Sequence, residues 1–173
     1  KTVTTEFAVM HPGKTRNPHN TAHTPGGSSS GSAAAVADYM VPLAFGSQTA
    51  GSVIRPAAYC GVVGYKPSFG LISRVGVKSL SDTLDTIGVI ARTVPDAALF
   101  AAAVSGRDEL QVDTASTSSK LRVGICRTYE WNQALPETVA AFERATAMLA
   151  AAGVAVKEIK LPPTYANLVQ AQT

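Results

Sequence analysis

The chain has 173 residues, of which 46% are hydrophobic and 16% charged, and its formal net charge is +3. This composition excludes an intrinsically disordered chain, and the length suffices for a domain with a core. The basic residues are scattered, which argues against a nucleic-acid-binding surface, and no apolar run approaches the roughly 20 residues that span a bilayer. We therefore expect a globular protein with neither nucleic-acid nor membrane partners.

The two cysteines, Cys60 and Cys126, lie in apolar stretches and are too few to staple a domain of this size. Free thiols are typical of a reducing compartment, so we expect a cytoplasmic protein. The chain begins without a methionine and ends, at residues 165–173, in a pattern typical of the opening of a helix. Residues 1–173 are therefore interpreted as part of a single domain that is truncated at both ends.

The first third of the chain combines a loop, a helix and short strands. Residues 11–24 are rich in His, Asn, Pro and Thr and predict a surface loop, whose three histidines lack the spacing of a metal site. The alanine-rich residues 31–40 predict a helix capped by the preceding serines. The next segments predict a buried strand, a turn, an ambiguous stretch and a second strand, at residues 41–45, 46–51, 53–61 and 62–65.

The middle of the chain predicts a strand followed by a well-delimited helix. Residues 86–91 read as the strand. The helix is predicted to follow Thr93, which has capping-box spacing to Asp96, and to end at Gly106. Loops are predicted on either side of this pair, at residues 71–81 and 109–120.

The last third predicts a strand–helix–strand unit. Strands at residues 121–126 and 154–161 flank a helix that begins at Pro136 and is closed by Gly153. This order indicates a parallel pair with a right-handed crossover. Because strands and helices interleave throughout, the fold class is α/β. An apolar stripe with helical spacing is expected in the core: Val139, Phe142, Thr146 and Leu149.

Two turns of small residues flank an apolar run at residues 33–45, which must be buried. The first turn, residues 26–32, reads GGSSSGS, and the second, residues 49–52, reads TAGS. Each concentrates hydroxyl groups on a backbone in which glycine permits unusual dihedral angles and the close approach of a ligand. The arrangement indicates a reaction centre.

Four interpretations compete for the first turn. A flexible linker does not normally run straight into a buried segment. A phosphate loop has the spacing of Gly26 and Gly31, but Ser32 stands where the lysine is required. A nucleophile elbow at Ser29 needs a preceding strand and a later histidine, and all three histidines come before it. The fourth is serine catalysis with a lysine, held neutral, as the base.

The paired turns resemble the amidase signature family. The resemblance rests on GGSSSGS at residues 26–32, on QTAGSVIRPA at 48–57, and on Ser28 and Ser52, which lie 24 residues apart as in that family. It continues through the segments at residues 64–68, 81–88 and 93–98. It therefore covers about the first two thirds of the chain.

The resemblance implies a fold and a chemistry. The fold is a mixed, largely parallel sheet covered by helices, and the activity is hydrolysis of carboxylic amides by a Ser-cisSer-Lys triad, without metal or organic cofactor. Ser52 is then the nucleophile that forms the acyl-enzyme, and Ser28, after a cis Gly27–Ser28 peptide, is the bridging serine. The oxyanion hole is implied to consist of four backbone N–H groups, those of Thr49, Ala50, Gly51 and Ser52.

The sequence departs from the family in its lysine. In the family this residue lies several dozen positions before the bridging serine, which places it beyond residue 1 here. Lys66 follows the nucleophile, so we expect it to be structural and the 173-residue chain to be inactive alone. Arg55 is expected either to support the turn beneath Ser52 or to be a solvated partner of a carboxylate. Asp82 and Asp85 are expected to cap turns.

The resemblance leaves three functions open. The first is an amidase acting on a small-molecule amide that the sequence does not specify. The second is the amide-hydrolysing subunit of a tRNA-dependent amidotransferase, acting on glutamine and passing ammonia to a partner subunit. The third is a catalytically inert piece, for which exposed apolar surface, a homodimer or aggregation is expected.

Overall fold

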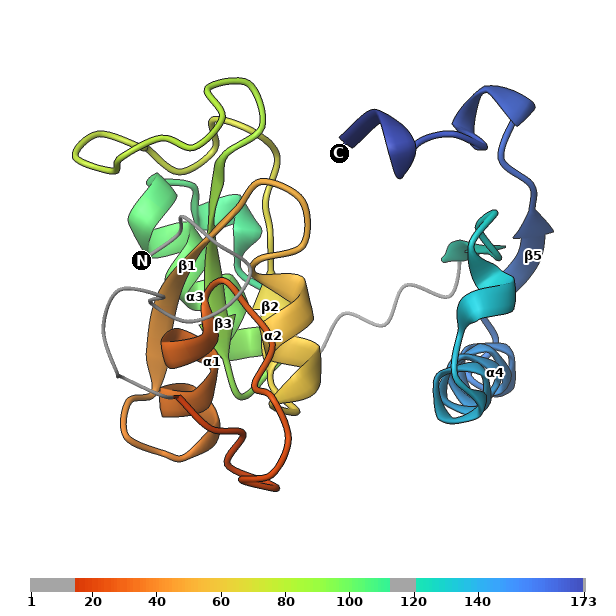
Figure 1. Ribbon diagram of the computed structural model, residues 1–173, viewed down its shortest axis with the longest axis horizontal. Helices are drawn as coiled ribbons and strands as arrows, with labels where there is room; N and C mark the ends of the chain where they lie inside the picture. The colour runs from red at the N-terminus through yellow and green to blue at the C-terminus, as the bar shows by residue number, and fades with distance from the viewer. Residues whose placement is uncertain (1–14, 113–120, 173) are drawn as a thin grey trace. The chain divides into compact units, whose positions relative to one another are not determined.

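The computed structural model describes residues 15–112 and 121–172, and the chain divides into two compact units, residues 1–114 and 115–173 (Figure 1). Each unit has its own sheet. Within the described ranges, no helix has the length and apolar character required to cross a membrane.

The first unit is built around a sheet of three strands, β1 (Leu43–Gln48), β2 (Val63–Tyr65) and β3 (Thr86–Ala91). Their order in the sheet is β1-β3-β2, and both outer strands are antiparallel to β3. The helix α2 (Ile54–Tyr59) links β1 to β2, and a long loop leads from β2 to β3, the middle strand of the sheet. The helix α1 (Ser30–Ala37) precedes β1, and α3 (Val94–Ser105) follows β3 and leads to a 3₁₀ turn at Asp108–Leu110.

Helices cover both faces of this sheet (Figure 1). Side chains alternate along a strand, and β3 is buried throughout. Ile87 and Val89 of β3 pack in one apolar cluster with Ala97 and Ala101 of α3. Ile90 of β3 packs in a second cluster, which holds α1 and the segment leading into α2. The sheet is thus a rigid central layer that fixes α1 and α2 on one face.

A pair of glycines lets the starts of α1 and α2 pack closely against the sheet. Gly46 of β1 and Gly88 of β3 lie opposite each other in the antiparallel register. A Cβ atom on Gly46 would lie 2.8 Å from Ser29 Oγ and 3.0 Å from a methyl group of Val53, and a Cβ atom on Gly88 would lie 3.2 Å from Val53. Only residues without side chains leave room there for Ser29 and Val53, which belong to the two serine-bearing segments.

The second unit is a parallel strand–helix–strand motif. The strands β4 (Arg122–Cys126) and β5 (Ala155–Ile159) pair in parallel, joined by α4 (Pro136–Ala151). The predicted stripe of α4 forms its only partly buried positions, Val139, Phe142, Thr146 and Leu149. Short 3₁₀ turns complete the unit at Trp131–Gln133, Pro163–Tyr165 and Gln170–Gln172.

Several sequence predictions are confirmed. The strand at 86–91 has the predicted bounds, and Thr93 caps α3 by accepting a hydrogen bond from Asp96 N, while Gly106 ends it in the left-handed conformation. The mixed α/β class is also confirmed. The two pairings in the sheet of the first unit are antiparallel and the one pairing in the second unit is parallel, so parallel pairing does not predominate among the described strands. In the first unit, β3 follows β2 through a loop without a crossover helix, which permits the antiparallel pairing.

Two predictions for the first unit are wrong. The turn expected at residues 46–51 begins later, because Gly46 continues β1 to Gln48. The strand tolerates this glycine because its lack of a side chain permits Ser29 and Val53 to pack closely against it. The preceding serines do not cap α1 through their side chains. The Ser29 hydroxyl bonds instead to the backbone of Ser47 on β1.

The glycine pair gives a testable prediction. Gly46→Ala forces a methyl group against Ser29 and Val53, so we expect the first unit to lose about 1–3 kcal/mol of its free energy of unfolding. Gly31→Ala, at an exposed position of α1 with open space around it, is the control and should be neutral or stabilising by up to about 1 kcal/mol. Hydrogen exchange of the β3 amides measures both, and equal effects of the two substitutions would refute the packing argument.

Candidate active site

Backbone and side-chain hydrogen bonds join the two serine-bearing turns. Ser29 N donates to Ser52 O at 3.2 Å, and Ser29 Oγ both accepts from Ser47 N at 3.3 Å and donates to Ser47 O at 3.4 Å. Ser29 therefore ties the first turn to β1 and to the second turn at once. As a consequence, Ser28, the residue before it, is held beside the segment that carries Ser52.

Arg55 makes a second connection between the turns. The peptide bond between Gly27 and Ser28 is cis, as the resemblance implied. The carbonyl oxygen of Gly27 accepts hydrogen bonds from Arg55 Nε at 3.0 Å and from Nη2 at 2.8 Å. The guanidinium fork thus supports the first turn from α2. The sequence had suggested that it supports the turn beneath Ser52 or is a solvated partner of a carboxylate, and its side-chain contact is instead with Gly27 of the first turn.

Gln48 shapes the second turn from within. Its Oε1 accepts hydrogen bonds from Val53 N at 2.9 Å and Ile54 N at 3.0 Å, and its Nε2 donates to Ala50 O at 2.8 Å. The first two bonds satisfy N–H groups at the start of α2, which have no partner within the helix. Sequence reasoning assigned Gln48 no role. Its position four residues before Ser52, where an amide can bond to the turn that it precedes, was the available signal.

Three of the four carbonyl groups of the second turn, those of Ala50, Gly51 and Ser52, accept hydrogen bonds from the protein. Gly51 O accepts from Arg55 N at 2.8 Å, Ser52 O accepts from Ser29 N, and Ala50 O accepts from Gln48. In the described part of the chain, by contrast, no acceptor binds the N–H groups of the turn, which are those of Thr49, Ala50, Gly51 and Ser52. This arrangement leaves a set of free backbone donors next to Ser52.

The two serine hydroxyl groups have different surroundings. Ser28 is buried, with 7% of its surface exposed, whereas Ser52 is half-buried and accessible. A half-buried Ser52, on a segment tied to the residue that follows the buried Ser28, fits a nucleophile with a relay residue beside it.

The Asp85 carboxylate holds the loop after residue 78 against the second turn. Oδ1 accepts from Thr49 Oγ1 at 2.5 Å. Oδ2 accepts from Leu80 N at 2.6 Å, Ser81 N at 3.0 Å and Ser79 Oγ at 3.2 Å. Burial acts to raise the pKa of Asp85, but these hydrogen bonds outweigh it and lower the pKa below the ordinary value of 3.8. The prediction that Asp85 caps a turn is therefore confirmed, and its contact with Thr49 is an addition to it.

The segment before the first turn is fastened to the end of α2. Asn17 Nδ2 donates to Tyr59 O at 2.8 Å, and His19 Nε2 lies 2.9 Å from the carbonyl oxygen of Cys60. Cys60 is a buried free thiol whose Sγ donates to Pro25 O at 3.6 Å, and burial raises its pKa. These contacts fix the approach of the chain to Gly26 and Gly27.

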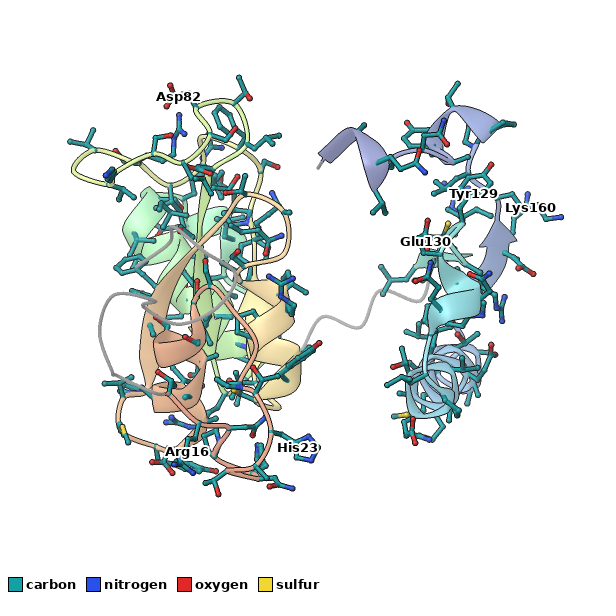
Figure 2. The ribbon with its side chains drawn as sticks, viewed as in Figure 1. Arg16, His23, Asp82, Tyr129, Glu130 and Lys160 are labelled. Carbon is teal, nitrogen blue, oxygen red and sulfur yellow. The ribbon has the colours of Figure 1, made fainter. Side chains whose placement is uncertain are left out.

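The other candidate residues lie away from the turns. His23 points away from the sheet, and Asp82 lies at the outer end of its loop (Figure 2). His11 lies outside the described residues, and within them no cluster of His, Cys, Asp and Glu is suited to a metal ion. Lys66 is exposed, and its Nζ donates to the carbonyl oxygen of Pro67 at 2.5 Å, a contact that accords with a structural role.

A family model described as amidase matches residues 2–171. The chain belongs to the amidase family. Among its relatives, a glutamyl-tRNA(Gln) amidotransferase subunit of Desulforapulum autotrophicum is 41% identical over 177 residues, covering 92% of this chain and 36% of the relative. The corresponding subunit of Thermotoga maritima is 41% identical over 172 residues, covering 91% of this chain and 35% of the relative. The 173-residue chain thus spans about a third of the length of these relatives.

Solved structures of amidases confirm the fold class. The peptide amidase from Stenotrophomonas maltophilia matches with a TM-score of 0.74 and 38% identity, over 87% of this chain and 34% of that one. The glutamyl-tRNA(Gln) amidotransferase subunit from Thermotoga maritima matches with a TM-score of 0.74 and 35% identity, over 91% of this chain and 40% of that one. The amidase-signature resemblance of the sequence is therefore confirmed.

The lowered pKa of Asp85 predicts a local dependence on pH. The stability that Asp85 contributes is fully present above its pKa in the unfolded chain and is lost as the pH falls through its lower folded pKa. We therefore expect protection of the Leu80 and Ser81 amides from hydrogen exchange to fall in acid before that of Ile90 in β3. Asp85→Asn should remove the acid-dependent part, and NMR-detected exchange that is insensitive to acid and to this substitution would contradict the assignment.

Proposed function

We propose that this chain is part of a protein that hydrolyses a carboxylic amide through an acyl-enzyme on Ser52. The observation that carries the proposal is the juxtaposition of the two turns, in which Ser29 N bonds to Ser52 O beside a set of free backbone donors. Ser28 is proposed as the relay residue. Arg55 supports it through the contact of its guanidinium group with the carbonyl oxygen of Gly27.

The reaction begins with a proton relay. A neutral lysine outside this chain accepts a proton from Ser28 as Ser28 accepts one from Ser52. The Ser52 oxygen then attacks the amide carbon, and negative charge develops on the carbonyl oxygen. The free N–H groups of the second turn, from Thr49 to Ser52, stabilise this charge, and each donor of this kind typically contributes about 2.7–4 kcal/mol.

The second half-reaction returns the enzyme to its starting state. The carbon–nitrogen bond breaks, and Ser28 passes a proton to the departing ammonia or amine, which leaves the acyl group on Ser52. Water, deprotonated by the same relay, attacks the ester and releases the carboxylic acid. The protein supplies every group in this scheme, so we expect neither metal nor organic cofactor.

A second function is favoured by the curated relatives. Those aligned over most of this chain at about 41% identity are named as amidotransferase subunits. The alternative proposal is that the same site hydrolyses glutamine in an enzyme of that kind, and that a tightly bound partner subunit receives the ammonia. Strong preference for glutamine and stimulation by a co-purifying partner support this alternative, whereas turnover of simple amides by the isolated protein supports a free-standing amidase.

The location, substrate and oligomeric state of the protein are part of the same proposal. The buried free thiol of Cys60 and the free thiol of Cys126 support a reducing, cytoplasmic location. The partner in catalysis is a small-molecule amide. A homodimer is expected only if the 173-residue chain is an inert piece, and size-exclusion chromatography with light scattering distinguishes a dimer from a monomer.

Labelling with a serine-directed fluorophosphonate, followed by peptide mapping, tests the proposal. We expect Ser52 to be labelled in a form of the protein extended at its N-terminus, and not in the 173-residue chain, because the extension supplies the base. Ser52-dependent amide hydrolysis by the short chain would overturn the view that Lys66 is structural. Absence of label on Ser52 in both forms would overturn the proposed function.

The roles of the serines are separated by substitution in the extended form. Ser52→Ala should abolish amide hydrolysis, and Ser28→Ala should slow it by about 10²–10⁴-fold, because the relay is a general acid–base group. Ser32→Ala, in the same small-residue stretch but at a half-buried position in α1, is the matched control and should change kcat by less than about twofold. If Ser28→Ala behaves like the control, Ser28 is not the relay.

A further inference from the structure

One peptide group of the second turn is not held by the backbone contacts described above. The carbonyls of Ala50, Gly51 and Ser52 each accept a hydrogen bond, from Gln48, Arg55 and Ser29 respectively. A peptide plane has its N–H opposite its C=O, so each contact also orients the N–H of the following residue. The peptide joining Thr49 to Ala50 differs, because neither its oxygen nor its N–H has a partner among the described residues.

The side chain of Thr49, which begins this peptide, is itself anchored by a hydrogen bond. Its hydroxyl donates to Asp85 Oδ1 at 2.5 Å, which is short for a bond between a hydroxyl and a carboxylate. Asp85 has 8% of its surface exposed, and three further donors from residues 79–81 fix its second oxygen. It also directly precedes β3, which is buried throughout, so the acceptor is anchored to the central strand of the sheet.

We propose that Asp85 is a positioning residue for catalysis, which acts through the Thr49 hydroxyl to hold the Thr49–Ala50 peptide and thereby direct the Ala50 N–H at the oxyanion. The inference rests on the proposed function, since it assigns a further residue to the same site. Within the described residues, the Asp85 carboxylate accepts hydrogen bonds from Thr49 and from residues 79–81, and from neither Ser28 nor Ser52. Its effect should therefore appear where charge develops in the transition state and not in ground-state binding.

The Thr49 hydroxyl is tested by a pair of substitutions in the N-terminally extended form. Thr49→Val removes the donor and keeps the branched shape, whereas Thr49→Ser keeps the donor. Loss of a complete oxyanion donor slows reactions by about 10²–10³-fold, so for a misdirected donor we expect Thr49→Val to lower kcat about 10-fold, with KM changed less than about twofold. Fluorophosphonate labelling of Ser52 should slow in parallel, and Thr49→Ser should recover most of both rates.

Asp85 and its neighbour Asp82 supply the second arm. Asp85→Asn should slow Ser52 labelling to a similar extent, and combining it with Thr49→Val should slow it little further, because both act on one contact. Asp82 is an exposed carboxylate in the same loop, without a hydrogen bond to any residue that the structure describes, so Asp82→Asn should match the wild type. If Asp85→Asn does not fold, the Thr49 pair still decides the matter.

The outcomes separate the inference from the function on which it depends. Absence of label on Ser52 in the wild-type extended form overturns both. Normal labelling of the wild type together with a wild-type rate in Thr49→Val overturns the positioning role alone. Equal loss in Thr49→Val and Thr49→Ser, or a rise in KM without a fall in kcat, also overturns it, because the hydroxyl contact would then not direct a transition-state donor.

Discussion

The contact between the backbones of the two small-residue turns is the constraint on which the rest of the first unit depends. Ser29 N reaches Ser52 O because the sheet beneath them lacks side chains at Gly46 and Gly88. The antiparallel register places these two glycines opposite each other, and the helices above them can then settle onto the strands. Segments separated by about twenty residues in the sequence are thus brought to one place by the absence of two methyl groups.

From this contact the distribution of polar groups in the site follows. A tight turn exposes its backbone donors and acceptors together, and a site that stabilises negative charge must satisfy the acceptors while leaving the donors free. Gln48, Ser29 and Arg55 meet this requirement by binding the carbonyl oxygens of Ala50 and of its neighbours. The N–H groups of Gly51 and Ser52 remain available, because folding has used the carbonyl oxygen at the opposite end of each of their peptides.

Local and pairwise features were predictable from the sequence. The N-cap at Thr93, the stripe of α4 and the spacing of the paired serines are short sequence patterns, and the structure reproduces the first two. The extent of β1 was not predictable, since Gly46 has the local signature of a turn and continues the strand only because of what packs over it. The contact of Arg55 with Gly27 and that of Asp85 with Thr49 were not predictable either, because they join residues 28 and 36 positions apart in the sequence.

The central claim is that the second turn, from Thr49 to Ser52, presents its N–H groups to an oxyanion on Ser52 while Ser28 lies beside the nucleophile. A crystal structure of the N-terminally extended protein bearing a phosphonyl group on Ser52 tests it most directly. The account predicts that the phosphonyl oxygen accepts hydrogen bonds of about 3 Å from these N–H groups, and that Ser28 Oγ lies within hydrogen-bonding distance of Ser52 Oγ. A phosphonyl oxygen directed to solvent, or a Ser28 hydroxyl turned away from Ser52, would contradict it.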